Sequence, residues 1–513
     1  MRSDPYPVVS RVERIAIIAV TCAFALVLVV WAFLTPAFDA PDEWLHFDAV
    51  LQVALGGGWP PPLQMHLLNA SVQMHAEAAD LVSSARSSVG ALLVAHPGTD
   101  GALTNQMSQH PPTWYFIAAG LLRLLHVQDL QWNDALLAVR LLNAVVFATM
   151  PALVWAAVRR LTRSPRAAVV AASVLLLVPQ AAYNGATANN DPPVVVLGAV
   201  VTWLVCRVLT GDRRVRTLSM LVLAAAAAIA FKATAFPVVP FAAIALVVSV
   251  RGRWRWPWAA LAVVVPVLLT SWWWVRNLIV YHTLQPAGLP RSTVEAVWPV
   301  GSGPDLGGFA NTFWTRVTNS FWGNYGDLAY PSSPLVIATL TVVCLAVVLV
   351  WGLRRTDRSA WVLVTLPLIT LVAGLQNNWT TYVRTTEPAG IQGRYYFVAL
   401  AALVCLSALA WRRFVPLDGR ARVSTALVIT SAAMAVYGFS VAYQGFYEEK
   451  RFTVTVAGLR DLAGQVPGGA PVIGTLAVVA AAGLVAAVLL VVRLVTRNPG
   501  NVLPDSATDG RSL

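Results

Sequence analysis

Continuous apolar runs of about 15 to 24 residues recur along the whole sequence, and each run is close to the length that crosses a bilayer as an α-helix. Only 12% of the residues are charged and 57% are hydrophobic, whereas a soluble domain carries about a quarter charged residues. The runs are continuous rather than alternating, which excludes a transmembrane β-barrel. We therefore expect an all-α, polytopic helical membrane protein.

We expect about twelve transmembrane helices. The first begins near the N-terminus; it is too long for the apolar region of a signal peptide and lacks a convincing cleavage site, so we interpret it as a retained span. The segment 113–126 is apolar but reaches only about 21 Å as a helix, so we expect an interfacial or re-entrant helix. The expected spans are 14–35, 135–157, 167–183, 193–210, 217–231, 236–250, 257–275, 334–352, 360–376, 395–411, 423–444 and 472–493.

The arginine clusters predict the orientation of these spans. With a cytoplasmic N-terminus, every short arginine-rich loop falls inside, as the positive-inside rule requires, and the C-terminus is cytoplasmic as well. The formal net charge of +12 is thereby explained by topology, and we expect no nucleic-acid partner. These loops contain the arginines of 159–166, 207–216, 251–255, 354–358 and 412–422.

This orientation defines the predicted organisation of the chain. Residues 1–411 form a catalytic transmembrane region with a long first outer loop, 36–134, and a second outer loop, 276–333. Residues 412–497 form C-terminal helices around a third outer loop, 445–471, and 498–513 form a disordered cytoplasmic tail.

The motif Pro-Asp-Glu-Trp-Leu-His-Phe places two carboxylates, Asp42 and Glu43, directly after the first span. Charge beside a membrane is costly unless it is solvated, paired or functional. Consecutive residues on a helix diverge by about 100°, so one carboxylate can act as a general base while the other orients a substrate. The alternative is an acidic helix start after Pro41, favoured by the helix dipole.

Other polar residues fall on the same predicted outer face. Turn and helix-start chemistry also explains His110 and the Asn190–Asp191 pair, and a snorkelling role also explains Lys232. Arginine binds phosphate bidentately, so two arginines and this lysine are candidates for a phosphate site. The candidate binding residues are His46, His110, Asn190, Asp191, Lys232, Arg276, Asn277, Trp322, Gln392 and Arg394.

We expect no metal and no cofactor. The four cysteines lie inside apolar runs, so they indicate neither disulfides nor a zinc site. The sequence contains no phosphate-binding glycine-rich loop, HExxH motif or nucleophile elbow. Asp42, Glu43, His46 and Asp191 are hard ligands that a divalent metal could use, but their spacing does not demand one.

The ordered motifs resemble the GT-C superfamily of integral-membrane glycosyltransferases. Asp42-Glu43-Trp44-Leu45-His46-Phe47 is similar to the motif that follows the first span of protein O-mannosyltransferases. His110-Pro111-Pro112-Thr113-Trp114-Tyr115 is similar to the Lys/His-Pro-Pro-Leu-Tyr-Tyr motif of aminoarabinose transferases. Further patterns similar to a bacterial branch are Asn190-Asp191, Trp274-Val275-Arg276-Asn277, Ser320-Phe321-Trp322-Gly323 and Gln392-Gly393-Arg394-Tyr395.

The resemblance implies inverting transfer of a sugar from a polyprenyl-phosphate donor to an extracytoplasmic acceptor at the plasma membrane. It implies Asp42 as general base, Glu43 as its support or as the residue that positions the acceptor, and basic residues that stabilise the departing phosphate. Alternatives are a flippase of lipid-linked sugars and a glycan polymerase or ligase. The Lys-poor, Ala- and Arg-rich composition indicates a high-GC bacterium.

Overall fold

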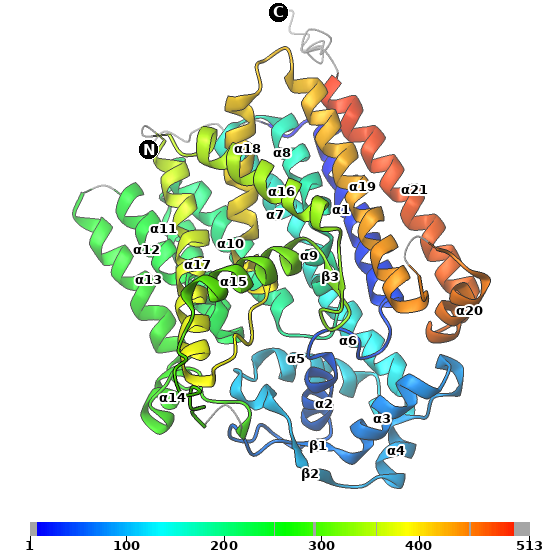
Figure 1. The fold of residues 1–513 in the computed structure, drawn as a ribbon. Helices are drawn as coiled ribbons and strands as arrows, with labels where there is room; N and C mark the ends of the chain where they lie inside the picture. Colours follow the sequence, from blue (N-terminus) through cyan, green and yellow to red (C-terminus); the bar gives the residue numbers. More distant parts are fainter. Residues whose placement is uncertain (1–7, 251, 291–293, 355–356, 451–452, 497–513) are drawn as a thin grey trace, which may run out of the picture.

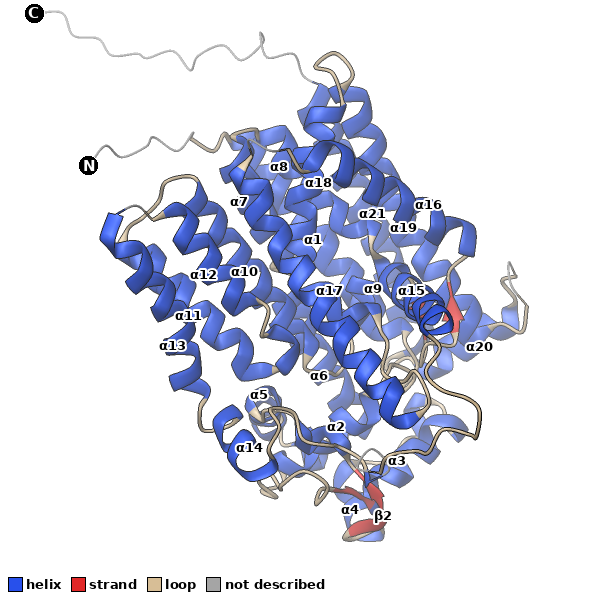
Figure 2. Ribbon diagram, turned by 60° about the vertical axis from the view of Figure 1, so that its left-hand side comes forward, coloured by secondary structure: helices blue, strands red, loops and turns tan. Residues whose placement is uncertain are grey.

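The computed structural model describes residues 8–250, 252–290, 294–354, 357–450 and 453–496. These residues form a bundle of helices with a smaller loop-rich cap at one end (Figures 1 and 2). The expectation of an all-α membrane protein is confirmed, since the described chain adds only two short two-stranded sheets to its helices. The predicted tail, 498–513, lies outside the described residues.

Most helices of the bundle follow the apolar runs, whereas α15 and α20 come from the predicted outer loops 276–333 and 445–471. Its helices are α1 (Arg11–Leu34), α6 (Trp132–Phe147), α7 (Met150–Thr162), α8 (Pro165–Ser173), α9 (Pro179–Gly185), α10 (Asp191–Leu209), α11 (Val215–Phe231), α12 (Val238–Ser249), α13 (Arg255–Thr270), α14 (Trp274–Tyr281), α15 (Leu306–Trp322), α16 (Pro334–Val347), α17 (Arg358–Thr385), α18 (Leu400–Phe414), α19 (Arg420–Tyr447), α20 (Val456–Gln465) and α21 (Gly469–Thr496).

Eight helices in the described chain are long and apolar enough to cross a membrane, or up to ten if each of two bent pairs is one span. The bent pairs turn by 76° between Leu177 and Pro179 and by 67° between Thr270 and Trp274. Each expected span falls on helical chain, but 167–183 and 257–275 each cross a break between two helices, and α11 and α12 are shorter than the usual spanning length. A 17-residue helix such as α11 is about 25 Å long. The count of twelve is therefore not confirmed.

The two ends of the described chain lie at the same end of the bundle. Helix α1 starts and α21 finishes there, and the two helices pack side by side (Figure 1). The connection between α18 and α19, which contains the predicted arginine cluster 412–422, lies at that end too (Figure 1). The loop-rich cap occupies the opposite end.

The cap is the predicted first outer loop, 36–134, and it has a hydrophobic core of its own. Strands β1 and β2 pair antiparallel in it, with His66 opposite Thr104. Apolar residues of α2, α3 and α5 fill this core, among them Phe47, Met74 and Tyr115. The elements of the cap are α2 (Glu43–Ala54), β1 (His66–Leu68), α3 (Asn69–Asp80), α4 (Val89–Ala95), β2 (Thr99–Thr104) and α5 (Thr113–Leu124).

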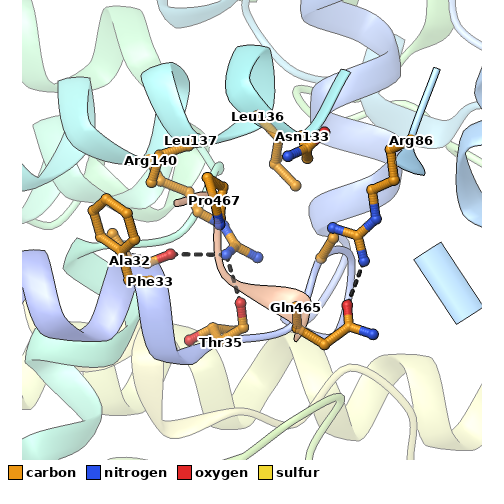
Figure 3. Close-up of a pocket in the computed structure, with 11 residues that line it drawn as sticks. Ala32, Phe33, Thr35, Arg86, Asn133, Leu136, Leu137, Arg140, Gln465 and Pro467 are labelled. Carbon is orange, nitrogen blue, oxygen red and sulfur yellow. Dashed lines mark hydrogen bonds between the residues drawn. The ribbon is translucent and has the colours of Figure 1, made fainter. Parts of the chain in front are cut away.

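Polar contacts connect elements at the junction between the bundle and the cap. Arg140, on α6, donates to the carbonyl oxygens of Ala32 and Thr35 at the end of α1, at 2.9 and 2.6 Å. Arg86, in the cap, donates to the side chain of Gln465 at the end of α20. Figure 3 shows these contacts around a small pocket of about 20 Å³, which has room for about one water molecule. This pocket is far too small for a sugar.

Candidate active site

Asp42 sits at the N-terminus of α2 in a left-handed backbone conformation, with φ 61° and ψ 6°. Aspartate tolerates this conformation better than most residues do. The turn directs consecutive side chains to different places. The side chain of Asp42 is 31% exposed, while that of Glu43 is fully buried. Asp42 is thus the carboxylate of this pair that an incoming molecule can reach.

A network of ion pairs connects Asp42 to three distant parts of the chain. Arg394 donates from Nη2 to Oδ2 of Asp42 at 2.7 Å, and its Nε lies 3.7 Å from Oδ2 of Asp191. Lys232 donates from Nζ to the other oxygen of Asp191 at 2.6 Å. Gln106 donates to Oδ1 of Asp42 at 3.3 Å. Four candidate residues selected from the sequence therefore lie together.

The local sequence explains how Arg394 reaches this position. It belongs to a 3-10 helix, η9 (Gly393–Ala399), that leads into α18. A Cβ atom on Gly393 would lie 2.4 Å from the backbone nitrogen of Phe321 on α15, so only glycine fits there. Ser320 accepts from the backbone nitrogen of Gly393 at 2.7 Å. The close approach of η9 to α15 holds Arg394 against the cap.

Two predicted histidines lie beside this network in the cap. Nδ1 of His46 is 2.9 Å from the hydroxyl of Tyr115, and His110 contacts the amide of Gln285 at 3.4 Å. Burial, and then the positive charge of Lys232, hold the pKa of both histidines well below the usual range. Both rings are therefore neutral at pH 7 and add no positive charge to the site.

Glu43 has a different environment from the one that a reacting group needs. Both of its oxygens accept from the guanidinium of Arg140, at 2.8 and 2.5 Å. They also accept from the backbone nitrogens of Phe38, at 3.2 Å, and Ala188, at 2.8 Å. The carboxylate thus joins the cap, α6 and the segment before α10. This geometry favours a structural role for Glu43 over the supporting role at the reacting centre that the resemblance implied.

The remaining candidates are placed less directly. Arg276 is exposed and lies over the ring of Tyr281, 5.6 Å from its centroid. Asn277 is buried and donates to the carbonyl oxygen of Leu284 at 3.2 Å. The indole nitrogen of Trp322 donates to Thr341 at 2.8 Å. These contacts lead away from Asp42, whereas Asn190 directly precedes Asp191 and Gln392 comes two residues before Arg394.

Several residues of the site were not selected from the sequence. Arg140 lies inside a predicted span, and a single charge within an apolar run indicates a buried partner; that signal was available. Tyr115 lies in the second quoted motif but was not given a role. Gln106 carries no motif of its own. No group of three or more His, Cys, Asp or Glu side chains that could hold a metal ion occurs in the described part of the chain, and the prediction of no metal stays a prediction.

Comparison with known proteins adds the family context. Residues 109–274, less than half of the chain, match the family model described as dolichyl-phosphate-mannose-protein mannosyltransferase. No curated protein sequence matches the chain. Among solved structures, ArnT from Cupriavidus metallidurans in the apo state is similar, with a TM-score of 0.49 and 16% identity over 93% of this chain and 77% of that chain.

A second similar structure is the oligosaccharyltransferase of Archaeoglobus fulgidus, in complex with Zn and sulfate. Its TM-score is 0.45, with 12% identity over 82% of this chain and 53% of that chain. The present chain thus spans about half the length of that enzyme.

The family match supports the resemblance to the GT-C superfamily for residues 109–274, which are similar to the protein mannosyltransferases. This segment contains four of the candidate residues, His110, Asn190, Asp191 and Lys232, whereas Asp42 and Arg394 lie outside it.

Proposed function

We propose that this membrane glycosyltransferase moves a sugar from a polyprenyl-phosphate donor to a hydroxyl group of an extracytoplasmic acceptor, with inversion at the sugar carbon. The observation that supports this proposal is the contact between Asp42 and Arg394 at 2.7 Å. It places an accessible carboxylate next to a buried cation. Inverting transfer from a phosphate needs a base for the acceptor and a cation for the leaving group.

In this reaction Asp42 takes the proton from the acceptor hydroxyl. The acceptor oxygen forms a bond to the anomeric carbon, while the bond from that carbon to the phosphate oxygen breaks. The electron pair leaves with the polyprenyl phosphate, whose charge is stabilised by Arg394 and Lys232. Arg394 is suited to this role because its guanidinium is buried and already oriented by Asp42 and Asp191.

The side of the membrane follows from the arrangement of charge. The site lies where the cap meets the bundle, and the start of α1 and the end of α21 lie at the other end of the bundle (Figure 1). The arginine cluster 412–422 lies at that other end, so the positive-inside rule makes it cytoplasmic. The site then faces the outside of the plasma membrane, where a lipid-linked donor and a cell-envelope acceptor can meet.

A transfer assay with the full-length protein in membrane vesicles tests the proposal. The vesicles receive decaprenyl phosphate carrying radiolabelled mannose or arabinose, and the label that moves into the lipid-free fraction is measured. We expect transfer from at least one of the two donors and release of decaprenyl phosphate in equal amount. Nucleoside diphosphate sugars should give none. Transfer from the nucleotide donors alone would contradict the proposal.

A further inference from the structure

Four amide side chains around the ion-pair network have buried polar atoms without partners. Both polar side-chain atoms of Asn190 are unpaired, as are Nδ2 of Asn184, Oδ1 of Asn324 and Oε1 of Gln392. Asn184 and Asn190 are 4% and 0% exposed. Buried polar groups are nearly always hydrogen-bonded, and leaving one unpaired costs about 1–3 kcal/mol. Such a concentration of unpaired amides indicates a hydrogen-bonding ligand.

The four amides come from three parts of the chain that the structure brings together. Gln180 connects two of them, because its Oε1 accepts from the backbone nitrogen of Asn324 at 2.6 Å and its Nε2 donates to Oδ1 of Asn184 at 3.4 Å. The carbonyl oxygen of Asn184 accepts from the side chain of Asn189 at 3.1 Å, within the same part of the chain. Asn190 is the next residue along that segment.

Two of the amides flank the proposed phosphate site directly. Asn190 precedes Asp191 and Gln392 comes two residues before Arg394, and Asp191 and Arg394 are 3.7 Å apart. In a sugar phosphate, the phosphate oxygen is attached to the sugar ring, so the ring lies beside whatever binds the phosphate. Asn190 and Gln392 thus belong to the segments that carry Asp191 and Arg394, and the partly exposed carboxylate of Asp42 is left for the acceptor.

The surroundings of the amides are rigid. Tyr183 and Tyr325, the sequence neighbours of Asn184 and Asn324, pack edge to face at 5.4 Å. Both rings also pack on Trp31 of α1, at 5.3 and 5.0 Å. The hydroxyl of Tyr183 donates to the carbonyl oxygens of Gly326, at 3.2 Å, and Asp39, at 3.4 Å. This packing fixes the chain next to Asn184 and Asn324, which holds these two residues in place for a ligand.

We propose that Asn184, Asn190, Asn324 and Gln392 form the subsite that binds the hydroxyl groups of the transferred sugar. Amides offer both donors and acceptors, which matches the mixed character of sugar hydroxyls. This inference rests on the proposed function, since it assigns the sugar of the donor to one side of the same site. It adds to that function a set of residues that selects the sugar, separate from the residues that bind the phosphate.

The test compares two ligands that differ only in the sugar. Full-length protein in detergent is titrated with decaprenyl phosphate and with decaprenyl-phosphate mannose or arabinose. The variants are Asn184→Leu and Asn324→Leu, which preserve side-chain size and remove the amide. Asn377→Leu on α17, where the asparagine is exposed, is the matched control. Thermal unfolding of each variant checks the fold.

We expect the wild type to bind the sugar-bearing ligand more tightly. Each subsite variant should weaken that ligand about tenfold, as expected for loss of hydrogen bonds in a buried site, while decaprenyl phosphate binds within about twofold of wild type. If a leucine variant is unfolded, Asn184→Ser and Asn324→Ser provide the same comparison.

Equal effects on both ligands, or no effect on either, would overturn the subsite and leave water as the partner of these amides. That outcome is distinct from failure of the proposed function. If the proposed function itself is wrong, the wild type should bind neither decaprenyl phosphate nor its sugar-bearing form.

Discussion

Arg394 and Asp42 are 352 positions apart in the sequence, yet their side chains meet at 2.7 Å. The pair joins the start of α18 to the cap. Arg394 also faces Asp191, which in turn is held by Lys232. Two cations and two carboxylates thus balance each other, so a phosphate that enters this network must share Arg394 with Asp42. Binding of the donor and the state of the proposed base are thereby coupled through one guanidinium.

Replacing the proposed base should stop transfer without preventing donor binding. Asp42→Asn keeps the shape of the side chain and removes its ability to accept a proton, so the rate of transfer should fall by at least ~10²-fold. The transfer assay and the titration with decaprenyl phosphate measure the two effects separately. Asp129→Asn, an exposed carboxylate of the same cap, is the control. If Asp42→Asn transferred sugar at nearly the wild-type rate, Asp42 would not be the general base.

The shape of the cation at position 394 should matter as much as its charge. Lysine in place of Arg394 cannot hold Asp42, Asp191 and the carbonyl oxygen of Pro41 at once, as the guanidinium does. We expect Arg394→Lys to weaken binding of decaprenyl phosphate by about tenfold. Arg384→Lys, which changes a half-exposed arginine of α17, should leave the binding of decaprenyl phosphate unchanged. Equal binding by both variants would contradict a phosphate site at Arg394.

The ion pair between Glu43 and Arg140 should support the fold rather than the reaction. Glu43→Gln leaves a buried guanidinium without its counter-charge, and removing one partner of a buried pair costs about 3–5 kcal/mol. The unfolding temperature should fall, and limited proteolysis should cut within 36–134 more quickly. Transfer per folded molecule should stay close to wild type.

The exposed pair of Glu295 and Arg384, 3.4 Å apart, offers the matched control, because Glu295→Gln should have almost no effect on unfolding. If Glu43→Gln instead abolished transfer in protein that remained folded, Glu43 would belong to the reacting centre after all.

Much of the arrangement follows from local sequence signals. The length of an apolar run indicates a helix, so the expected spans fall on helical chain, and the position of Asp42 after the first run placed it in the cap. Spatial pairing does not follow from such signals. Asp42 and Glu43 look equivalent in the sequence, and only the left-handed turn at Asp42 separates them into an accessible and a buried carboxylate.

Two of the four unpaired amides, Asn184 and Asn324, were not selected from the sequence, because their role also depends on spatial neighbours. Asn184 lies just past the predicted span 167–183, and Asn324 lies in a predicted loop, where an asparagine usually serves a turn. Their importance depends on what surrounds them, and this depends on the 76° bend before α9. The bend brings Gln180 and Asn184 to β3 (Asn324–Tyr325). Hydropathy alone treats that bent pair as one straight span.

Asp39 offers a test of the electrostatics of the cap. Burial, and then the negative charges of Glu43 and Asp327, raise the pKa of Asp39 to about 6, against an opposing effect of Arg140. Its ordinary pKa is 3.8, so the folded state holds this proton more tightly than the unfolded state. The resulting stabilisation is fully present below pH 3.8 and is lost as the pH rises through about 6.

Asp39→Asn should therefore stabilise the protein at pH 8, by at most about 3 kcal/mol, and have little effect near pH 4. The gain should grow between these values and level off above pH 6, where Asp39 is ionised in both states. Thermal unfolding across this range measures it, with Asp129→Asn as the control. A gain of the same size at every pH would show that the asparagine acts through packing, because only a change of charge on Asp39 can give the pH dependence.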